Sequence, residues 1–436
     1  TGPENLYCLM NFTWKIIYNT LILPILVLLV YIAALFNPKL REGIRGRHKT
    51  FERLRNYFKD VNHDQLTYWF HAASHGEYEQ VKPVIRGLKE ILPESKMVVS
   101  FFSPSGFRNV DDKNIDCKIY LPVDFPWLVN KALRIIQPKK IIFAAYDVWP
   151  NMIWQAHRQG IHINIFSARF AKGTTKLYPI IRSLYQNVYT CFSTIYTITE
   201  KDNSRLQKIL TNRKKPLVRV LGNPRYDQVK TNADQFTKER TESVLNRDQR
   251  LVIGSVWPED ENIIFDPIVK LLEEFKDLSI LWVPHEPSGR YITHSIDAFN
   301  QHGYSTTTYA SCDGDINNGT RVIVVDIVGT LANLYWQGQI AYVGGGFSTG
   351  VHNVMEPAIA RLPVLFGPKY NNSQEAEQLI ENNGGFSIKD NESAYNIFHK
   401  LLTDRNVFLK ASFSATDVIH RNLGSATRVV RGIIRD

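Results

Sequence analysis

Short apolar runs alternate with helical patterns along most of the chain, and this rhythm predicts its architecture. In the first half the apolar runs read as strands, because they are short, rich in β-branched and aromatic residues, and bounded by turn residues. These predicted strands are residues 68–72, 96–102, 117–121, 140–144, 162–166, 194–197 and 217–221. The helical patterns between them are residues 79–92, 126–136, 152–159 and 177–188. Strands that alternate with helices indicate a parallel sheet.

The second half repeats the pattern after a polar connecting helix, predicted for residues 236–245. Its predicted strands are residues 251–255, 279–283, 322–325, 340–343 and 364–366. The last 46 residues, 391–436, look helical and basic. The fold class that follows is α/β, with two Rossmann-like, doubly wound domains facing a cleft. Ligands of such sheets bind at the carboxyl ends of the strands.

Residues 12–36 are apolar, with a single charge near the start of the segment. Their length is enough to cross about 30 Å of hydrocarbon, so we expect a transmembrane helix. Seven basic residues follow within residues 39–55, and the positive-inside rule therefore predicts that this flank and everything after it lie in the cytoplasm. A cleaved signal peptide and a buried helix are the alternatives, although no cleavage site with small residues closes the segment.

With 436 residues, the chain exceeds the size of a single core, and two domains are expected. The predicted divisions are a membrane anchor at 12–36, a first domain at 37–230, a second domain at 231–415, and a C-terminal helix at 416–436 that packs back on the first domain. The net charge of +10 suits an anionic partner, such as nucleic acid, a phospholipid surface or a phosphorylated substrate. The four cysteines lack metal-ligand spacing and are expected to be free thiols in a reducing compartment.

The segment 343–368 is the most informative of the chain. A strand runs into three glycines, including Gly345 and Gly346, and is followed by His352, Asn353 and Glu356, a helix of small residues and a second strand. Glycines let the backbone approach a bound group, and a following helix offers N–H groups to a phosphate. Glu356 could hold the hydroxyls of a ribose. The segment lacks the G-x-G-x-x-G spacing, which favours a nucleotide-sugar site over an NAD site.

In the first half, the predicted strand 68–72 leads into a turn and the start of a helix. There Glu77 could act as a general base toward a sugar hydroxyl, with Ser74 and Gly76 beside the acceptor. The same Ser-x-x-Glu spacing is also a capping box, which stabilises a helix without any chemistry. His71 and His75 are more often core or loop histidines.

Other strand ends carry polar residues as well. Asp147 follows the strand 140–144, where it could assist Glu77 or favour a helix N-terminus. Arg169 and Arg225 follow later strands, where a guanidinium could bind a carboxylate or phosphate, although most arginines are solvated surface charges. In the second half the corresponding positions are Gly254, Ser255, His285 and Gly329. The convergence of these positions, rather than any one loop, indicates a ligand site.

These residues resemble those of a known family, the Kdo transferases of lipopolysaccharide synthesis, which are membrane-anchored glycosyltransferases of the GT-B fold. The resemblance covers most of the chain after residue 36. It rests on His71-Ala-Ala-Ser74-His-Gly76-Glu77, Trp149-Pro150-Asn151, Ala168-Arg169, Gly222-Asn223, Gly254-Ser255, Val343-Gly-Gly and His352-Asn353-x-x-Glu356-Pro357-Ala358.

The resemblance implies that Glu77 is the general base and that the second-half loops hold the CMP moiety of CMP-Kdo. It further implies inverting transfer to the lipid A precursor, with no metal and no cofactor, at the inner membrane of a Gram-negative bacterium. The expected partners are that lipid, the CMP-activated sugar and membrane phospholipids, and no nucleic acid.

The chain departs from the family pattern at several positions. Where the family usually has Glu-Thr-Glu-Leu-Trp, this chain has Ala145-Tyr146-Asp147-Val148-Trp149. The other departures are Val256-Trp257 for Thr-His, Pro284-His285 for Arg-His, and Val328-Gly329-Thr330 for Met-Gly-Glu. They leave three rivals: a GT-B enzyme that uses a UDP-sugar on another lipid, a UDP-sugar epimerase, and a non-catalytic, anchored nucleotide-binding protein.

Overall fold

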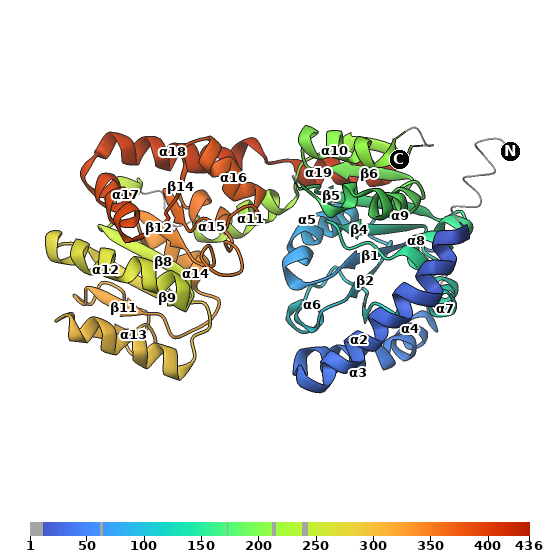
Figure 1. Ribbon diagram of the computed structural model, residues 1–436, viewed down its shortest axis with the longest axis horizontal. Helices are drawn as coiled ribbons and strands as arrows, with labels where there is room; N and C mark the ends of the chain where they lie inside the picture. The colour runs from blue at the N-terminus through green and yellow to red at the C-terminus, as the bar shows by residue number, and fades with distance from the viewer. Residues whose placement is uncertain (1–11, 62–63, 172, 212–214, 238–242) are drawn as a thin grey trace. The chain divides into compact units, whose positions relative to one another are not determined.

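The computed structural model describes residues 12–61, 64–171, 173–211, 215–237 and 243–436. The chain forms two compact units, each with its own sheet (Figure 1). The first unit runs to Gln228 and includes Gly424–Asp436, and the second is Val229–Leu423. The sequence places these two boundaries at 230 and 416.

The first unit is built on seven parallel strands in the order β3-β2-β1-β4-β5-β6-β7. Every strand predicted for this half is present. The strands are β1 (Thr67–Ala72), β2 (Lys96–Phe101), β3 (Cys117–Tyr120), β4 (Lys140–Ala144), β5 (His162–Ala168), β6 (Thr194–Thr197) and β7 (Leu217–Val220). The order changes direction between β1 and β4, which are direct neighbours. In a doubly wound sheet, the carboxyl ends at this switch point form the ligand crevice.

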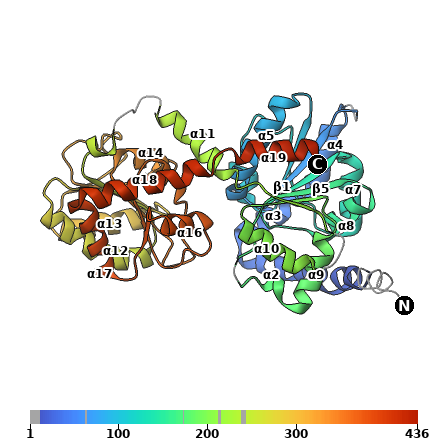
Figure 2. The same cartoon turned by 90° about the horizontal axis from the view of Figure 1, so that it is seen from above.

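Helices pack on both faces of the first sheet, so β1 and β4 are buried along their full length. Several of these helices start with proline, whose fixed φ suits the first helical position. The helices are α5 (His75–Ile91), α6 (Pro104–Asn109), α7 (Pro126–Ile136), α8 (Pro150–Arg158), α9 (Pro179–Tyr189) and α10 (Glu200–Leu210). The C-terminal helix α19 (Ser425–Arg435) lies beside α5 (Figure 2), where Val429, Val430 and Ile433 join the core formed with Val81 and Val84.

The N-terminal apolar helix covers Phe12–Phe36 and is long and apolar enough to cross a membrane. It contains a π-helical turn, Tyr18–Ile22, just before Pro24, whose missing N–H disrupts the regular ladder. The stretch α2 (Leu23–Phe36) follows, then α3 (Pro38–His48) and α4 (Thr50–Phe58), drawn in blue in Figure 1.

One face of this N-terminal helix packs on the first unit. The Trp14 indole donates to Ser183 Oγ at 3.0 Å, and the Tyr18 hydroxyl donates to Asp124 Oδ2 at 3.0 Å. Leu23 is fully buried in the core. These contacts attach one face of the helix to the first unit, while most of its apolar surface stays exposed, so the membrane-crossing helix stays a prediction.

The second unit contains another seven-stranded parallel sheet, in the order β10-β11-β9-β8-β12-β13-β14. Its strands are β8 (Arg250–Val256), β9 (Ser279–Pro284), β10 (Thr306–Thr308), β11 (Val322–Val324), β12 (Ile340–Val343), β13 (Val364–Phe366) and β14 (Gly385–Ser387). The two edge strands, β10 and β14, are additional to those predicted. The switch point of this sheet lies between β8 and β12.

The helices of the second unit include α12 (Pro258–Glu274), α13 (Gly289–Gln301), α15 (Met355–Ile359), α16 (Gln374–Glu381), α17 (Asn391–Thr403) and α18 (Arg405–Arg421). The connecting helix predicted for residues 236–245 is wrong. The helix here is α11 (Arg225–Thr237), and a short 3-10 turn, Val244–Asn246, precedes β8. Residues 238–242 lie outside the described residues. Of the predicted free thiols, Cys117, Cys191 and Cys312 are free, and Cys8 lies outside the described residues.

Candidate active site

A hydrogen bond joins two strand ends at the switch point of the first sheet. His71 lies in β1 and is fully buried, and its Nε2 is 3.0 Å from Oδ2 of Asp147, which follows β4. The Nδ1 of His71 faces Ser100 Oγ at 3.0 Å. It also faces the Ser100 carbonyl oxygen at 3.1 Å, and because a carboxylate can only accept, Nε2–H is the donor to Asp147. His71 therefore fixes the position of the Asp147 carboxylate.

Glu77 lies in the first turn of α5, close to this pair. Its Oε2 accepts a hydrogen bond from the Ala73 N–H at 2.6 Å, and its own N–H donates to Ser74 Oγ at 3.5 Å. The Ser74 half of the predicted capping box is therefore present, whereas the Glu77 carboxylate bonds to the residue before the N-cap, through one oxygen. Burial raises the pKa of Glu77 to about 7, with a further increase from the charge of Asp147, while the Ala73 hydrogen bond and His71 act in the opposite direction. A carboxyl with such a pKa is suited to general base catalysis near neutral pH.

The predicted acceptor residues Ser74 and Gly76 lie at the same helix N-terminus. Ser74 is the N-cap of α5, and Gly76 is in its first turn. A Cβ added at Gly76 would meet only Ser74 Oγ, at 3.9 Å, so packing of the protein does not require glycine here. The missing side chain leaves open space beside Glu77.

Two further side chains belong to this cluster. The Trp149 indole N–H donates to Asp147 Oδ2 at 3.2 Å. Partial burial of the Tyr146 phenol raises its pKa, the charges of Glu77 and Asp147 raise it further, and Arg169 lowers it. Glu77, Asp147 and Arg169 therefore lie within electrostatic range of one phenol group.

Backbone strain is concentrated at these strand ends. Ala145, Ser167 and Ser255 have φ values of 62°, 53° and 56°, in the left-handed region that non-glycine residues rarely adopt. The register of β5 against β6 and of β8 against β9 shifts at the two serines. Strained residues persist where the surrounding structure holds them, and they are concentrated at functional sites.

Arg225, which was predicted to bind a carboxylate or phosphate, is the first residue of α11 and belongs to the first unit. Its N–H donates to Asn223 Oδ1 at 3.0 Å.

In the second unit, the glycine-rich loop after β12 closes on itself. A Cβ at Gly345 would come within 2.4 Å of Gly350 O, and one at Gly346 within 2.5 Å of Gly367 N. These glycines are therefore required by the packing of the loop, which differs from the predicted reason, the approach of a ligand. The loop is also held by Asp260, whose Oδ2 accepts from the Gly345 N–H at 2.7 Å. Asp260 is fully buried, and burial raises its pKa above the usual range.

Three aromatic rings assemble at the switch point of the second sheet. The Trp257 indole donates to His352 Nε2 at 2.8 Å, and the two ring planes are 3° apart. The His285 ring stacks on both, with centroid distances of 4.3 Å to Trp257 and 4.4 Å to His352. Burial, with His285 as a second cause, lowers the pKa of His352 to about 4, so this imidazole is neutral and accepts the indole proton. The three residues follow β8, β9 and β12, so the structure brings together loops that are far apart in sequence.

The remaining predicted donor residues lie at the same edge of the sheet. Gly254 and Ser255 are in the last part of β8, and Asn353 Oδ1 accepts from the Met355 N–H at 3.2 Å at the start of α15. Glu356 is half-buried within that helix, which has only five residues. Gly329 is exposed in the loop after β11, with a φ of 89°.

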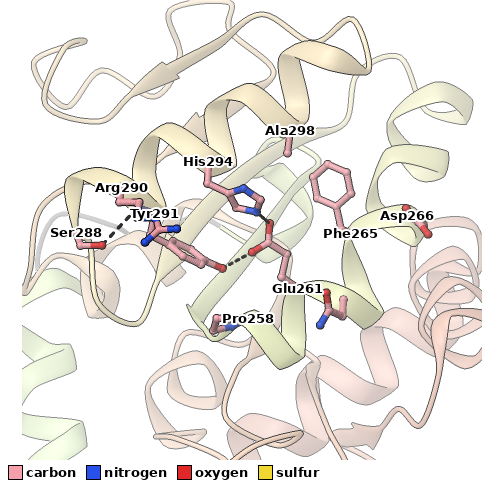
Figure 3. A pocket seen from close by; sticks show the side chains of 10 residues that line it. Pro258, Glu261, Phe265, Asp266, Ser288, Arg290, Tyr291, His294 and Ala298 are labelled. Atoms are coloured by element: carbon pink, nitrogen blue, oxygen red, sulfur yellow. Dashed lines mark hydrogen bonds and ion pairs between the residues drawn. The ribbon is translucent and has the colours of Figure 1, made fainter.

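The second unit also contains a cavity of 650 Å³ between α12 and α13 (Figure 3). Glu261 points into it and bonds to the Tyr291 hydroxyl and to His294 Nε2. None of the predicted donor residues lines this cavity, so its size does not make it the site of the chemistry. In the part of the chain that the structure describes, no group of three or more His, Cys, Asp or Glu residues has metal-binding geometry.

Sequence reasoning missed two positioning residues. Trp257 was noted only as a departure from a family pattern, and no feature of the sequence shows that it would bond to a histidine 95 positions later. Asp260 could have been found, because an acidic residue in the first turn of a helix that follows Gly-Ser is a usual ligand of nearby backbone N–H groups.

Two doubly wound parallel sheets, each with its polar loops at the switch point, are the architecture of a GT-B glycosyltransferase. The UDP-GlcNAc 2-epimerase from Neisseria meningitidis, solved bound to UDP-GlcNAc, has this fold. The TM-score is 0.61 at 13% identity, over 85% of this chain and all of the other.

The sequence comparisons are more specific. Residues 48–228 match the family model of 3-deoxy-D-manno-octulosonic-acid transferase (kdotransferase). A 3-deoxy-D-manno-octulosonic acid transferase of Haemophilus influenzae is 25% identical over 432 residues, which cover 96% of this chain and 97% of that protein. One from Rickettsia felis is 27% identical over 341 residues, which cover 78% of this chain and 72% of that protein. The predicted resemblance is confirmed, because the chain is similar over most of its length to glycosyltransferases of the Kdo transferase family.

Proposed function

We propose that the protein transfers Kdo from CMP-Kdo to the lipid A precursor, lipid IVA, with inversion at the anomeric carbon. The reaction takes place at the cytoplasmic face of the inner membrane of a Gram-negative bacterium, where the helix Phe12–Phe36 holds the enzyme. It uses neither a metal ion nor a cofactor other than the donor. The family match supports Kdo transfer, and the choice of acceptor and mechanism rests on the site.

The observation that carries the mechanism is the environment of Glu77. Its carboxyl is buried beside Asp147 and has a pKa of about 7, close to the value that is best for a general base. Glu77 removes the proton from the acceptor hydroxyl, and the acceptor oxygen forms a bond to the anomeric carbon of Kdo. The bond between that carbon and the phosphate oxygen breaks, and CMP leaves with the electron pair.

The second unit holds the donor in this proposal. Its glycine-rich loop and the rings of His285 and His352 bind CMP, and Glu356 binds the ribose. The charge of the departing phosphate is met by fixed hydrogen-bond donors, which act strongly in a site from which water is excluded. No additional cation is needed in principle, because CMP is a stable leaving group.

Mass spectrometry of a tetra-acylated lipid A precursor incubated with CMP-Kdo and the protein tests this function. We expect an increase in lipid mass by one or more Kdo residues. An unchanged lipid mass would contradict the proposal. Glu77→Gln, which keeps an oxygen to accept from Ala73, should lower kcat at least about 100-fold with an intact fold. Normal turnover by this variant would remove Glu77 from the mechanism.

A second candidate is a GT-B reaction with a UDP-sugar donor. The observation in its favour is Trp257, which forms part of the ring assembly at a position where the family usually has histidine. A donor screen separates the two, because transfer from a UDP-hexose without transfer from CMP-Kdo would select this candidate. Conversion of free UDP-GlcNAc to its 2-epimer would identify an epimerase instead.

A further inference from the structure

A cavity of 480 Å³ lies within the first unit beneath α2. It separates the inner face of α2 from the loops that follow β2, β3 and β4. Its walls are largely apolar and include Val27, Val30, Phe51, Phe125, Leu128 and Trp149. The volume falls within the range of about 300–1,000 Å³ that is usual for ligand pockets.

The outer face of α2 places this cavity next to lipid. Ile25, Leu28, Leu29 and Ile32 are 48%, 59%, 58% and 47% exposed, so one side of α2 is a continuous apolar surface. The acyl region of a membrane is the surroundings that such an apolar outer face fits, because these side chains are costly to expose to water. An acyl chain that leaves the bilayer beside α2 therefore needs to move only across this helix to reach the cavity.

Positive charge lies at one side of the cavity. Arg47 and His48 are among its lining residues. The Arg47 guanidinium is held in place, because it donates to Phe102 O at 2.8 Å and lies over the Phe102 ring at 4.5 Å. Lys39, Arg41 and Arg45 are in the same helix, α3. This arrangement is complementary to a lipid whose head carries negative charge.

The other side of the cavity is a wall of the catalytic cluster. The Trp149 ring lines the cavity and stacks on Phe102, with ring centroids 5.3 Å apart. Its indole N–H donates to Asp147 Oδ2, which is also bonded to His71. One side chain therefore separates the apolar cavity from the carboxylate cluster. A cavity next to the carboxylate cluster suits a lipid that presents a hydroxyl to Glu77, and it gives no advantage for binding a bulk phospholipid.

We propose that this cavity binds an acyl chain of the lipid acceptor, so that the acceptor is selected by its chain as well as by its sugar. The inference rests on the proposed function, because it assumes an acylated, anionic acceptor. The chain lies between α2 and the loop residues of the first unit, and its anionic head lies toward α3. The acylated acceptor is thereby positioned before the donor reacts.

Replacement of Val30 by tryptophan fills the cavity, and Leu29→Trp is the matched control, because Leu29 is the neighbouring residue on the outer face. The substrates are the acylated lipid A precursor and the same phosphorylated disaccharide with its acyl chains removed, each with CMP-Kdo. We expect Val30→Trp to raise KM for the acylated acceptor about tenfold. The reason is that the acyl chain would bury roughly two fewer methylene groups in the filled cavity. KM for the deacylated acceptor and the rate of CMP-Kdo hydrolysis should be unchanged, and Leu29→Trp should behave like wild type.

The outcomes distinguish the two proposals. If the wild type transfers Kdo to neither acceptor, the proposed function fails. If it transfers Kdo and a folded Val30→Trp variant has wild-type KM values for both acceptors, the cavity proposal fails alone. An equal rise in KM for both acceptors in Val30→Trp would also contradict the cavity proposal. So would a rise in KM for the acylated acceptor in Leu29→Trp as large as that in Val30→Trp. Leu128→Trp, which fills the cavity from α7, provides a second variant if Val30→Trp does not fold.

Discussion

The Nε2 atom of His71 lies 3.0 Å from Oδ2 of Asp147, across the boundary between β1 and β4. This bond joins residues 76 positions apart at the one place where the first sheet reverses its strand order. Because Asp147 also accepts from Trp149, its carboxylate is held from two sides. The negative charge of Asp147 contributes to the raised pKa of Glu77. His71 therefore acts as a positioning residue and Asp147 as a tuning charge in the proposed mechanism.

Asp147→Asn tests that assignment. The amide oxygen can still accept from His71 and Trp149, but the negative charge is gone. We expect the pKa of Glu77 to fall, because the charge of Asp147 raises it. The rising limb of kcat/KM against pH should shift to lower pH, with a lower plateau because Glu77 becomes a weaker base. Asp277→Asn, at an exposed position of the second unit, is the control. An Asp147→Asn profile with the same midpoint as wild type would argue against coupling between these carboxyl groups.

The pH dependence of the wild-type enzyme follows from Glu77 itself. The base is active when deprotonated, and its pKa is about 7. Below that value we expect kcat/KM to rise about tenfold per pH unit, and above about pH 8 it should reach a plateau. Steady-state rates from pH 5.5 to 9 with CMP-Kdo and a lipid acceptor measure this limb. A rate that is constant from pH 5.5 to 7 would show that Glu77 is not the base.

Glu77 also affects stability, with a sign that is opposite to that of most carboxylates. Its pKa rises from 4.5 to about 7 on folding, so the native state binds more protons than the unfolded state between these values. The free energy of unfolding therefore falls as pH rises from about 4.5 to 7, by up to about 3 kcal/mol.

Glu77→Gln removes this ionisation. The Tm of the variant should exceed that of wild type at pH 8, and the difference should shrink toward pH 4.5. Thermal unfolding at several pH values measures it, with Glu90→Gln, an exposed position in the same helix, as the control. A Tm difference of the same size at every pH would contradict the raised pKa.

The fold follows closely from the sequence pattern, whereas the internal contacts of the site do not. Buried parallel strands are continuous apolar runs, so all strands except β10 and β14 were predictable. Those two strands are three-residue edge strands, and Thr306–Thr308 is polar and half-buried, so neither produces an apolar run. Glu77 and Asp147 could be assigned to one site because parallel strands end at the same edge.

The pattern of apolar and polar residues does not show which side chains bond to one another in the folded protein. The bond between His71 and Asp147 depends on β1 and β4 being neighbours, which is a property of the strand order. A buried histidine in an apolar strand looks like a core residue in sequence, and His71 is both a core residue and a partner of the site. The assembly of Trp257, His285 and His352 likewise requires three loops from different strands.

Trp257→Phe tests the role of that assembly. The phenyl ring can still stack on His285, but the donor to His352 Nε2 is lost. Loss of one hydrogen bond is worth about 1 kcal/mol, so we expect KM for CMP-Kdo to rise about fivefold while KM for the lipid is unchanged. In NMR spectra of the labelled wild type, the His352 ring should remain neutral down to pH 5, since its pKa is about 4. An unchanged donor KM would show that the rings do not contribute to donor binding.

The position of Phe12 relative to the membrane provides the final prediction. Trp14 bonds to Ser183 in α9, and Asn19 Nδ2 bonds to Asn151 Oδ1 in α8 at 3.2 Å, so the start of the apolar helix lies on the folded unit. We therefore expect Phe12→Cys and Glu94→Cys, both at exposed positions of the first unit, to be on the same side of the membrane. In intact spheroplasts neither introduced thiol should react with a membrane-impermeant maleimide, and after lysis both should react. Labelling of the chain without an introduced cysteine gives the background to subtract. Labelling of Phe12→Cys alone in intact spheroplasts would instead establish a helix that crosses the membrane.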